Sequence, residues 1–434
     1  MTSDLLASPC EPKDEQEWPY EQEDCAKKAH VHSLLVDRAD HLRATCFLDN
    51  RGRIVSDSLL WKADEHQYYI DVPATTADRL LSHLKQFQLR RSRVKISDKS
   101  GSISSHVIFG TLQSNGNPPG FLVGMDPRHP SLGIRVLNIT QEQERTVHKV
   151  PVGFEDLMND QFPNAPGTYN VVRKLAGIAE GAELSNRLAL ETNQEFLNVI
   201  SFRKGCYLGQ EVTARIHHTG AVRKRVMPVI LLDTRLQIPG PWLLSSQSQQ
   251  CSREQQLERN LRGTDTFNQH DNSKEIVLSP HKIPRISVAT AGSLVALTTA
   301  SMEENKFESN VEKAVPPDEA ENSSFLPLDF IDRMQKLQEG DKLVDARDGR
   351  TIGHLVAAPE EGTNVVLASM RLDAVGLIGD GNWTQQNKIY ITGSCDQSTS
   401  RKRGASFRYL PYLPLWWPKV DPVTGKELKQ GSSH

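Results

Sequence analysis

One short turn constrains this chain more than any other segment, because it places a single cysteine between two glycines. Residues 204–211 read KGCYLGQE, with the apolar run FLNVISF at 196–202 before them and EVTARI at 211–216 after them. Glycine permits left-handed backbone and the close approach of a neighbour. A nearby ammonium favours the thiolate over the thiol. The sequence therefore predicts a reactive Cys206, supported by Lys204 and held between two ordered elements.

Several segments around this turn share the pattern of a known family. They are YNVVRKLAGIAEG at 169–181, LETN at 190–193, the turn itself, and TARIHHTGAVRKR at 213–225. Together they resemble the YgfZ-type branch of the folate-dependent aminomethyltransferase superfamily, whose eukaryotic members are mitochondrial iron–sulfur cluster assembly factors. The resemblance covers residues 43–235 and 340–418.

The resemblance implies a mitochondrial matrix protein needed to mature 4Fe-4S enzymes such as aconitase and the lipoate-forming radical enzymes. It implies A-type iron–sulfur scaffold proteins as partners, and tetrahydrofolate bound in a central cavity with the cysteine turn at its rim. Cys206 would be the thiolate and the metal ligand, with Lys204 as its electrostatic support. Gln210 and Glu211 would be hydrogen-bonding groups that hold the turn or the ligand.

The number and spacing of the cysteines limit the kind of metal site that this chain can form. Cys206 itself could be a buried structural thiol, a common state for free cysteine, but its polar and glycine-rich neighbours favour a functional role. The chain has no CxxC pair, which argues against a zinc ribbon, a disulfide framework and a four-thiolate motif for a resident cluster. Any cluster handled here is therefore expected to be transient or shared with a partner. The other cysteines are Cys10, Cys25, Cys46, Cys251 and Cys395.

A folate-dependent one-carbon transferase is the competing function. Such an enzyme needs an acid or base beside the folate nitrogen that carries the one-carbon unit, and Asp57 and Asp126 are the candidate carboxylates. Strand alternation would gather Arg91, Arg93 and Lys95 on one face, where they could meet the glutamate tail of the folate or simply face solvent.

Charge argues against a third function, folate-linked modification of transfer RNA. Lysine and arginine number 51 against 54 acidic residues, and the formal net charge of −3 gives no global field for gripping a nucleic-acid backbone. No segment approaches the ~18 consecutive apolar residues that a membrane-spanning helix requires. We therefore expect neither nucleic-acid binding nor membrane insertion.

The first 42 residues read as an acidic leader that we expect to be disordered. Residues 1–25 contain eight acidic residues and the single base Lys13, whereas a mitochondrial presequence is rich in arginine and poor in acids. The family's opening phrase, phenylalanine-leucine-glutamine-glycine, is also missing ahead of residue 43. Either a replacement leader precedes a chain that begins downstream of the true start, or the protein is a divergent form. The first is favoured, because a lost strand would leave a sheet edge unpaired.

We expect an α+β, aminomethyltransferase-like multidomain fold. A ferredoxin-like, folate-binding-like domain at 43–145 starts with a hairpin turning at 50–52, followed by a helix that Thr75 or Thr76 caps. A middle domain at 146–225 carries the cysteine turn. A β-barrel at 226–434 is interrupted by a low-complexity, disordered and dispensable insertion at 244–324, with a possible strand pair at 286–297. The strands expected in the first domain are 44–48, 54–60, 68–72, 94–96, 107–109 and 134–137.

Three further motifs have both a structural and a functional interpretation. His217 and His218 would point to opposite faces of a strand, which disfavours a shared metal ion. The basic run 223–225 is a solvated edge or, less favoured, a phosphate clamp. Trp416 and Trp417 plug the barrel mouth or, alternatively, stack on a pterin ring.

Overall fold

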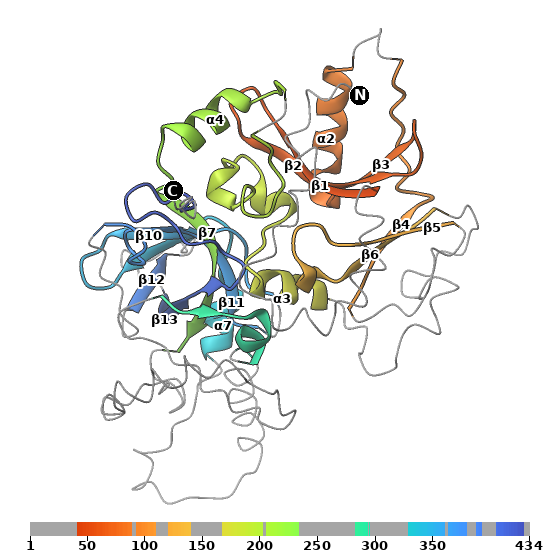
Figure 1. The fold of residues 1–434 in the computed structure, drawn as a ribbon. Coiled ribbons are helices and arrows are strands. Elements are labelled where there is room, and N and C mark those ends of the chain that lie inside the picture. Colours follow the sequence, from red (N-terminus) through yellow and green to blue (C-terminus); the bar gives the residue numbers. More distant parts are fainter. Residues whose placement is uncertain are drawn as a thin grey trace, which may run out of the picture.

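The computed structural model describes residues 41–88, 93–109, 120–139, 167–202, 205–233, 283–293, 295, 329–360, 363–379, 388–392 and 405–428. Within these residues the protein mixes helices and strands. Figure 1 shows a barrel on one side, two small sheets on the other, and the middle segment of the chain between them. No described helix is long and apolar enough to cross a membrane.

The first sheet is antiparallel and has the order β1-β2-β3. Its strands are β1 (Leu42–Leu48), β2 (Ile54–Lys62) and β3 (Tyr68–Asp71). The predicted hairpin turn is present: Asp49 N–H donates to the Arg53 carbonyl at 2.8 Å, and Gly52 adopts a left-handed φ of 71°. This hairpin therefore presents a tight, glycine-containing tip at one end of the sheet.

Helix α2 (Ala74–Gln86) covers one face of that sheet, where Leu80 and Leu84 pack with Phe47 and Val55. The predicted threonine cap is wrong, because the residue before the helix is Pro73 and no side chain caps its first turn. Thr76 lies inside the helix instead. Its hydroxyl bonds Ser56 at 2.7 Å on the facing strand.

A second antiparallel sheet has the order β4-β6-β5 and is separate from the first. Its strands are β4 (Ser104–Ile108), β5 (Phe121–Met125) and β6 (Ile134–Asn138), preceded by the 3₁₀ turn η4 (Pro130–Leu132). The described strands thus form two three-stranded sheets rather than one ferredoxin-like sheet. The strand expected at 94–96 is absent, since residues 93–99 form neither helix nor strand and Arg93 has a left-handed φ of 53°.

The expected barrel is present and closed. Its strands follow the order β10-β11-β7-β13-β12-β9, and each pairs antiparallel with its neighbours. They are β7 (Lys224–Leu232), β9 (Lys342–Asp345), β10 (Thr351–Leu355), β11 (Val365–Arg371), β12 (Lys388–Thr392) and β13 (Ala405–Pro411), with helix α7 (Asp329–Gln335) beside them.

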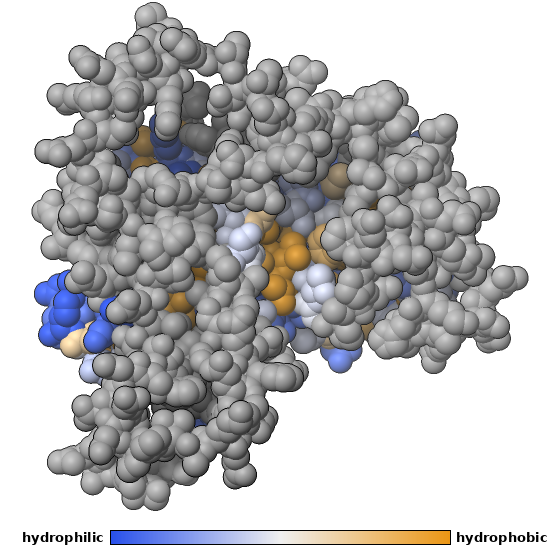
Figure 2. Space-filling view, turned by 90° about the horizontal axis from the view of Figure 1, so that it is seen from below, coloured by the Kyte–Doolittle hydropathy of each residue, from blue (hydrophilic) through white to orange (hydrophobic). Residues whose placement is uncertain are grey.

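The middle segment joins the sheets to the barrel. It contains α3 (Thr168–Leu175), the 3₁₀ turns η6 (Gly181–Leu184) and η7 (Leu190–Thr192), and α4 (Gln210–His218). One apolar core runs from Leu42 of β1 through Ile178 to Trp417 near the end of the chain. Seen from below, hydrophobic side chains are visible in the middle of the molecule (Figure 2).

The barrel end is tied to this middle segment by hydrogen bonds. The Tyr412 hydroxyl donates to the Leu175 carbonyl at 2.7 Å, and Trp416 Nε1 donates to the Ala176 carbonyl at 2.8 Å. Both tryptophans of the pair are buried, which fits the packing interpretation of Trp416 and Trp417 and leaves no exposed ring face for a ligand.

Part of the predicted insertion belongs to the core. Strand β8 (Arg285–Ile286) pairs in parallel with β14 (Leu413–Pro414), and residues 288–293 are helical rather than part of a strand pair. Ile286 and Ala291 are buried in the main core. Replacing all of 244–324 would therefore remove core side chains, contrary to the expectation that the whole range is dispensable. Most of that range lies outside the described residues.

Candidate functional site

The cysteine turn presents its thiol to solvent. Cys206 is exposed, whereas the next residue, Tyr207, is buried in the main core. Leu208 packs against the cluster that joins the first sheet to α2. Buried Tyr207 and half-buried Leu208 thus anchor the turn directly beside an exposed thiol. Lys204, the predicted electrostatic support, lies outside the described residues.

The two glycines of the turn have different roles. Gly209 has a left-handed φ of 79°, and a Cβ there would lie 2.5 Å from the Asp49 carbonyl oxygen and 2.9 Å from Gly52 Cα. Gly209 therefore allows the turn to sit directly on the tip of the β1–β2 hairpin. A Cβ on Gly205 would meet nothing within 4 Å, so no described contact requires glycine at that position.

The last two residues of the turn, Gln210 and Glu211, also have different roles. Gln210 Oε1 accepts a hydrogen bond from Tyr207 N–H at 3.3 Å, a contact that closes the turn. The Glu211 side chain is 90% exposed and lies 3.9 Å from Arg215 on the next turn of α4. Glu211 is thus a solvent-facing residue of the helix.

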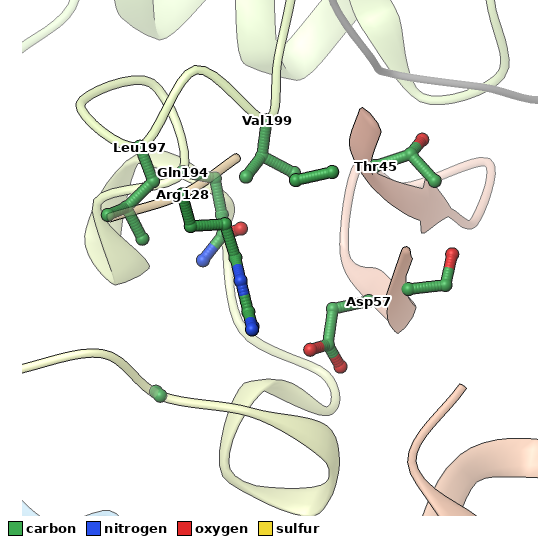
Figure 3. Close-up of a pocket in the computed structure, with 9 residues that line it drawn as sticks. Thr45, Asp57, Arg128, Gln194, Leu197 and Val199 are labelled. Atoms are coloured by element: carbon green, nitrogen blue, oxygen red, sulfur yellow. The ribbon is translucent and has the colours of Figure 1, made fainter. Parts of the chain in front are cut away.

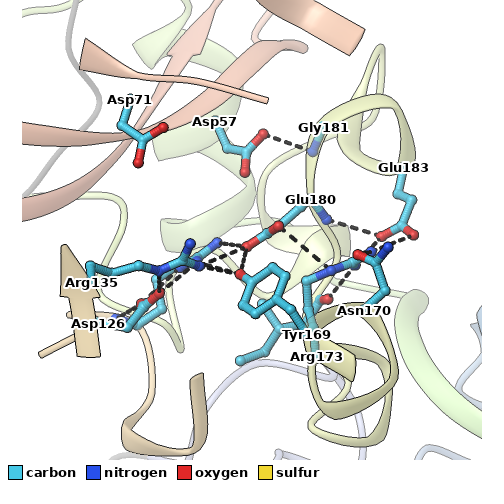
Figure 4. A network of polar contacts seen from close by, with 12 residues as sticks. Asp57, Asp71, Asp126, Arg135, Tyr169, Asn170, Arg173, Glu180, Gly181 and Glu183 are labelled. Carbon is cyan, nitrogen blue, oxygen red and sulfur yellow. Dashed lines mark hydrogen bonds and ion pairs between the residues drawn. The ribbon is translucent and has the colours of Figure 1, made fainter. Parts of the chain in front are cut away.

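A separate network of charged side chains lies in the interior of the protein. At its centre, two arginines hold one carboxylate (Figure 4). Asp126 accepts hydrogen bonds from Arg128 Nη2 at 2.7 Å and Arg135 Nε at 2.8 Å. Burial alone would raise the pKa of Asp126, but the adjacent Arg128 and Arg135 lower it to about 2. Asp126 therefore stays ionised and is unsuited to exchange protons near neutral pH.

The network continues through residues that sequence reasoning did not single out as site residues. Arg128 Nη1 lies 2.5 Å from Glu180, and the Tyr169 hydroxyl donates to the same carboxylate. Arg173 pairs with Glu183 at 2.5 Å. The signal was present in YNVVRKLAGIAEG, where Tyr169 and Arg173 are one helical turn apart and so share a face of α3.

The fourth carboxylate of this network is Asp57. The other three are Asp126, Glu180 and Glu183, and the three arginines are Arg128, Arg135 and Arg173. Asp57 accepts a hydrogen bond from Gly181 N–H at 2.9 Å, but no ion pair joins it to an arginine within the described residues. Burial and the negative charge of Glu180 raise its pKa to about 6, against the opposing pull of Arg128. Of the two candidate carboxylates, only Asp57 can gain or lose a proton near neutral pH.

Asp57 faces a small pocket between β1, β2 and the middle segment. Figure 3 shows its carboxylate and the side chains of Arg128 and Gln194 directed toward the same space. The space is small, with room for about one water molecule. The hydroxyl oxygens of Thr45 and Ser58, two of its lining residues, are buried without a hydrogen-bond partner among the described residues. The remaining lining residues are Ala44, Ala179, Leu197 and Val199.

Asp57→Asn should change how stability depends on pH. The pKa of Asp57 is about 6 in the folded protein, against an ordinary value of 3.8. The contribution of Asp57 to the free energy of unfolding is therefore fully present below pH 3.8 and is lost as pH rises through about 6. Between about pH 4 and pH 7, wild type should lose on the order of 2 kcal/mol of unfolding free energy relative to the variant.

Urea unfolding of both proteins at the two pH values measures this difference. Ser58→Ala is the matched control, because it changes the same pocket without changing a charge and should shift stability equally at both pH values. A wild-type-minus-Asp57→Asn difference that does not vary with pH would contradict the raised pKa.

The predicted basic residues do not gather at this pocket. Arg93 and Lys95 are exposed in a segment without a strand, neither lines the pocket, and Arg91 lies outside the described residues. Arg225 is fully buried, with Nη2 2.7 Å from Glu195 and its guanidinium 4.0 Å from the Phe196 ring centroid. The solvated-edge interpretation of 223–225 is thus wrong for its last residue, because the middle segment and the end of the chain cover Arg225, which donates to the Leu190 carbonyl at 2.7 Å and to the Gly425 carbonyl at 3.1 Å.

The two histidines lie at the end of α4 rather than on a strand. His217 stacks on Phe202 with 3.7 Å between ring centroids and 13° between planes. Among the described residues, no group of three or more His, Cys, Asp or Glu side chains could hold a metal ion.

Comparison with known proteins gives relatives over part of the chain. No family model matches. A region of 201 residues is 34% identical to a protein of Pyricularia oryzae, covering 44% of this chain and 48% of the relative. A region of 214 residues is 33% identical to a protein of Mycosarcoma maydis, covering 46% and 49%. A region of 218 residues is 28% identical to a protein of Dictyostelium discoideum, covering 43% and 51%.

All three relatives carry the name iron-sulfur cluster assembly factor IBA57 homolog, mitochondrial. The chain spans about half the length of these curated relatives. Over that part of its length, this chain resembles the IBA57-type branch of assembly factors that its cysteine turn predicted.

Proposed function

We propose that this protein is an iron–sulfur cluster assembly factor that acts in mitochondria and supports the maturation of 4Fe-4S enzymes. The observation that carries the proposal is the exposed thiol of Cys206, set beside the buried Tyr207 on a chain similar to relatives named for that role. The expected clients are enzymes of the aconitase and lipoate synthase type.

A single thiol fits a shared cluster better than a resident one. Thiolate sulfur is a soft ligand of the kind that iron–sulfur clusters select, and these clusters ordinarily take four such ligands. Cys206 is the only exposed cysteine among the described residues. We therefore propose that it supplies one ligand while an A-type scaffold protein supplies the others, so that the cluster is cargo passing between the two.

A reduced folate is the proposed occupant of the Asp57 pocket. As it stands the pocket has room for about one water molecule, far less than the roughly 300–1,000 Å³ of sites for whole small molecules. The fused-ring head of tetrahydrofolate would therefore enter only if the walls of the pocket moved apart. The ionised carboxylate of Asp57 would accept hydrogen bonds from the ring N–H groups, and the glutamate tail would lie outside. Calorimetry with tetrahydrofolate tests this; the absence of heat at millimolar ligand counts against it.

One observation favours the transferase as the second candidate. The pKa of Asp57, raised by burial to about 6, lies near the working pH that a general acid or base requires. A transferase of this kind would depend on Asp57 and not on Cys206. The near-zero net charge gives no support to the transfer-RNA alternative.

Complementation separates the two functions. Fungal cells depleted of their own assembly factor of this type and expressing this protein should regain aconitase activity and protein lipoylation. If the protein were a transferase without a role in cluster assembly, both readouts would stay at the depleted level even though tetrahydrofolate binds.

A further inference from the structure

The end of the chain forms a second support for the cysteine-bearing segment. Residues 419–428, here called the C-terminal hairpin, fold back on themselves through a bridge between Val420 and Glu427. Asp421 N–H donates to the Lys426 carbonyl at 2.7 Å. The Asp421 carboxylate accepts from Thr424 N–H at 2.6 Å. These bonds give the hairpin a defined shape of its own.

The C-terminal hairpin is fixed to the barrel core. Buried Arg225 donates from Nε and Nη2 to the Gly425 carbonyl at 3.3 and 3.1 Å. Val222 N–H donates to the Thr424 carbonyl at 2.7 Å. Gly425 has a left-handed φ of 65°, and a Cβ there would lie 2.1 Å from the Val222 carbonyl oxygen. The hairpin therefore cannot shift along the barrel without breaking buried contacts.

From this fixed position, Lys426 reaches the end of α4. Its Nζ donates to the carbonyl oxygens of His217 at 3.1 Å and His218 at 3.4 Å. The last carbonyls of a helix have no partner within the helix and carry partial negative charge, so an ammonium there both bonds and stabilises them. Figure 1 shows the C-terminal segment beside the end of α4.

The same helix end contacts Phe202, a residue shortly before the cysteine turn. His217 stacks on Phe202, which is the last described residue before Gly205 and Cys206. The far end of the turn is fixed separately by Gly209 on the hairpin tip of the first sheet. Packing thus holds Phe202 and Gly209, one on each side of Cys206, and the contact of Phe202 depends on where α4 ends.

We propose that Lys426 is a positioning residue for Cys206. Its ammonium fixes the end of α4, which holds His217 against Phe202 and so fixes where the cysteine turn begins. The importance of this for cluster handling rests on the function proposed above, but the positioning itself does not. It can be measured without any cluster.

Hydrogen exchange of the full chain, read by mass spectrometry, tests the proposal. In Lys426→Met, which keeps the aliphatic length and removes the ammonium, the hydrogen-bonded amides of the turn, at Tyr207 and Gln210, should exchange about five- to tenfold faster. Lys426→Arg should restore the wild-type rate. Lys419→Met is the matched control, because this exposed lysine of the same hairpin has no described side-chain contact, and it should change nothing.

A second variant tests the route from Lys426 to the turn. His217→Leu removes the ring stack without touching the C-terminal hairpin, and it should accelerate the same amides. If both act through one path, the double variant should exchange no faster than the quicker single variant. Unchanged exchange at Tyr207 and Gln210 in Lys426→Met, or effects that add in the double variant, would overturn the proposal. Neither result would bear on whether Cys206 handles a cluster.

Discussion

Cys206→Ser should fold normally and still fail to support 4Fe-4S enzymes. The side chain is exposed, so exchanging sulfur for oxygen disturbs no packing, and melting temperature should stay at the wild-type value. The variant loses the soft ligand that iron selects. Cells relying on it should show aconitase activity and protein lipoylation at the depleted level, whereas tetrahydrofolate binding persists.

The buried cysteine provides the contrast. Cys46 is fully buried on β1 in the main core, where Cys46→Ser should cost about 0.5–3 kcal/mol, as buried substitutions commonly do. It should therefore lower stability, while the protein that remains folded keeps its function. Full rescue of both enzyme readouts by Cys206→Ser at native expression would refute the role assigned to the thiol. Damage confined to Asp57→Asn would then favour the transferase.

Gly209→Ala should strongly destabilise the protein. The alanine would have to adopt a left-handed backbone, and its Cβ would lie 2.5 Å from the Asp49 carbonyl oxygen. The first effect costs about 1–2 kcal/mol, and crowding of a packed contact adds about 1–3 kcal/mol. Urea unfolding should thus show a loss of roughly 3 kcal/mol.

Gly205→Ala is the matched control within the same turn. A Cβ there meets nothing within 4 Å, so its stability should stay within about 0.5 kcal/mol of wild type. Equal losses at the two positions would show that the turn does not rest on the hairpin tip in the way described.

Short sequence patterns predicted the elements of this fold that depend mainly on neighbouring residues. The hairpin at 50–52 and the barrel strands β7, β9, β10 and β11 follow from turn residues and short apolar runs. Strand prediction was wrong at 94–96, where Val94 and Ile96 are flanked by charged residues and Arg93 leaves the extended region. Two alternating apolar residues were too few to specify a strand.

Long-range pairing explains what the sequence alone did not reveal. Asp57, Asp126 and Glu180 lie far apart along the chain, and only the fold brings their charges together around Arg128. Arg225 looked like one of three surface bases, yet it faces into the protein and pairs with Glu195. Which charges are buried depends on tertiary partners that residue spacing does not encode.

Because the core is continuous, the stability of each part of this protein depends on the others. Because Leu42 of the first sheet and Trp417 beyond the barrel share one apolar cluster, we expect unfolding to be cooperative across the described elements. A substitution that weakens the barrel then lowers the abundance of the whole protein in the cell, since unfolded chains are removed by proteolysis. Inherited or selected loss of function should consequently map to positions far from Cys206, and their severity should follow protein level rather than distance from the thiol.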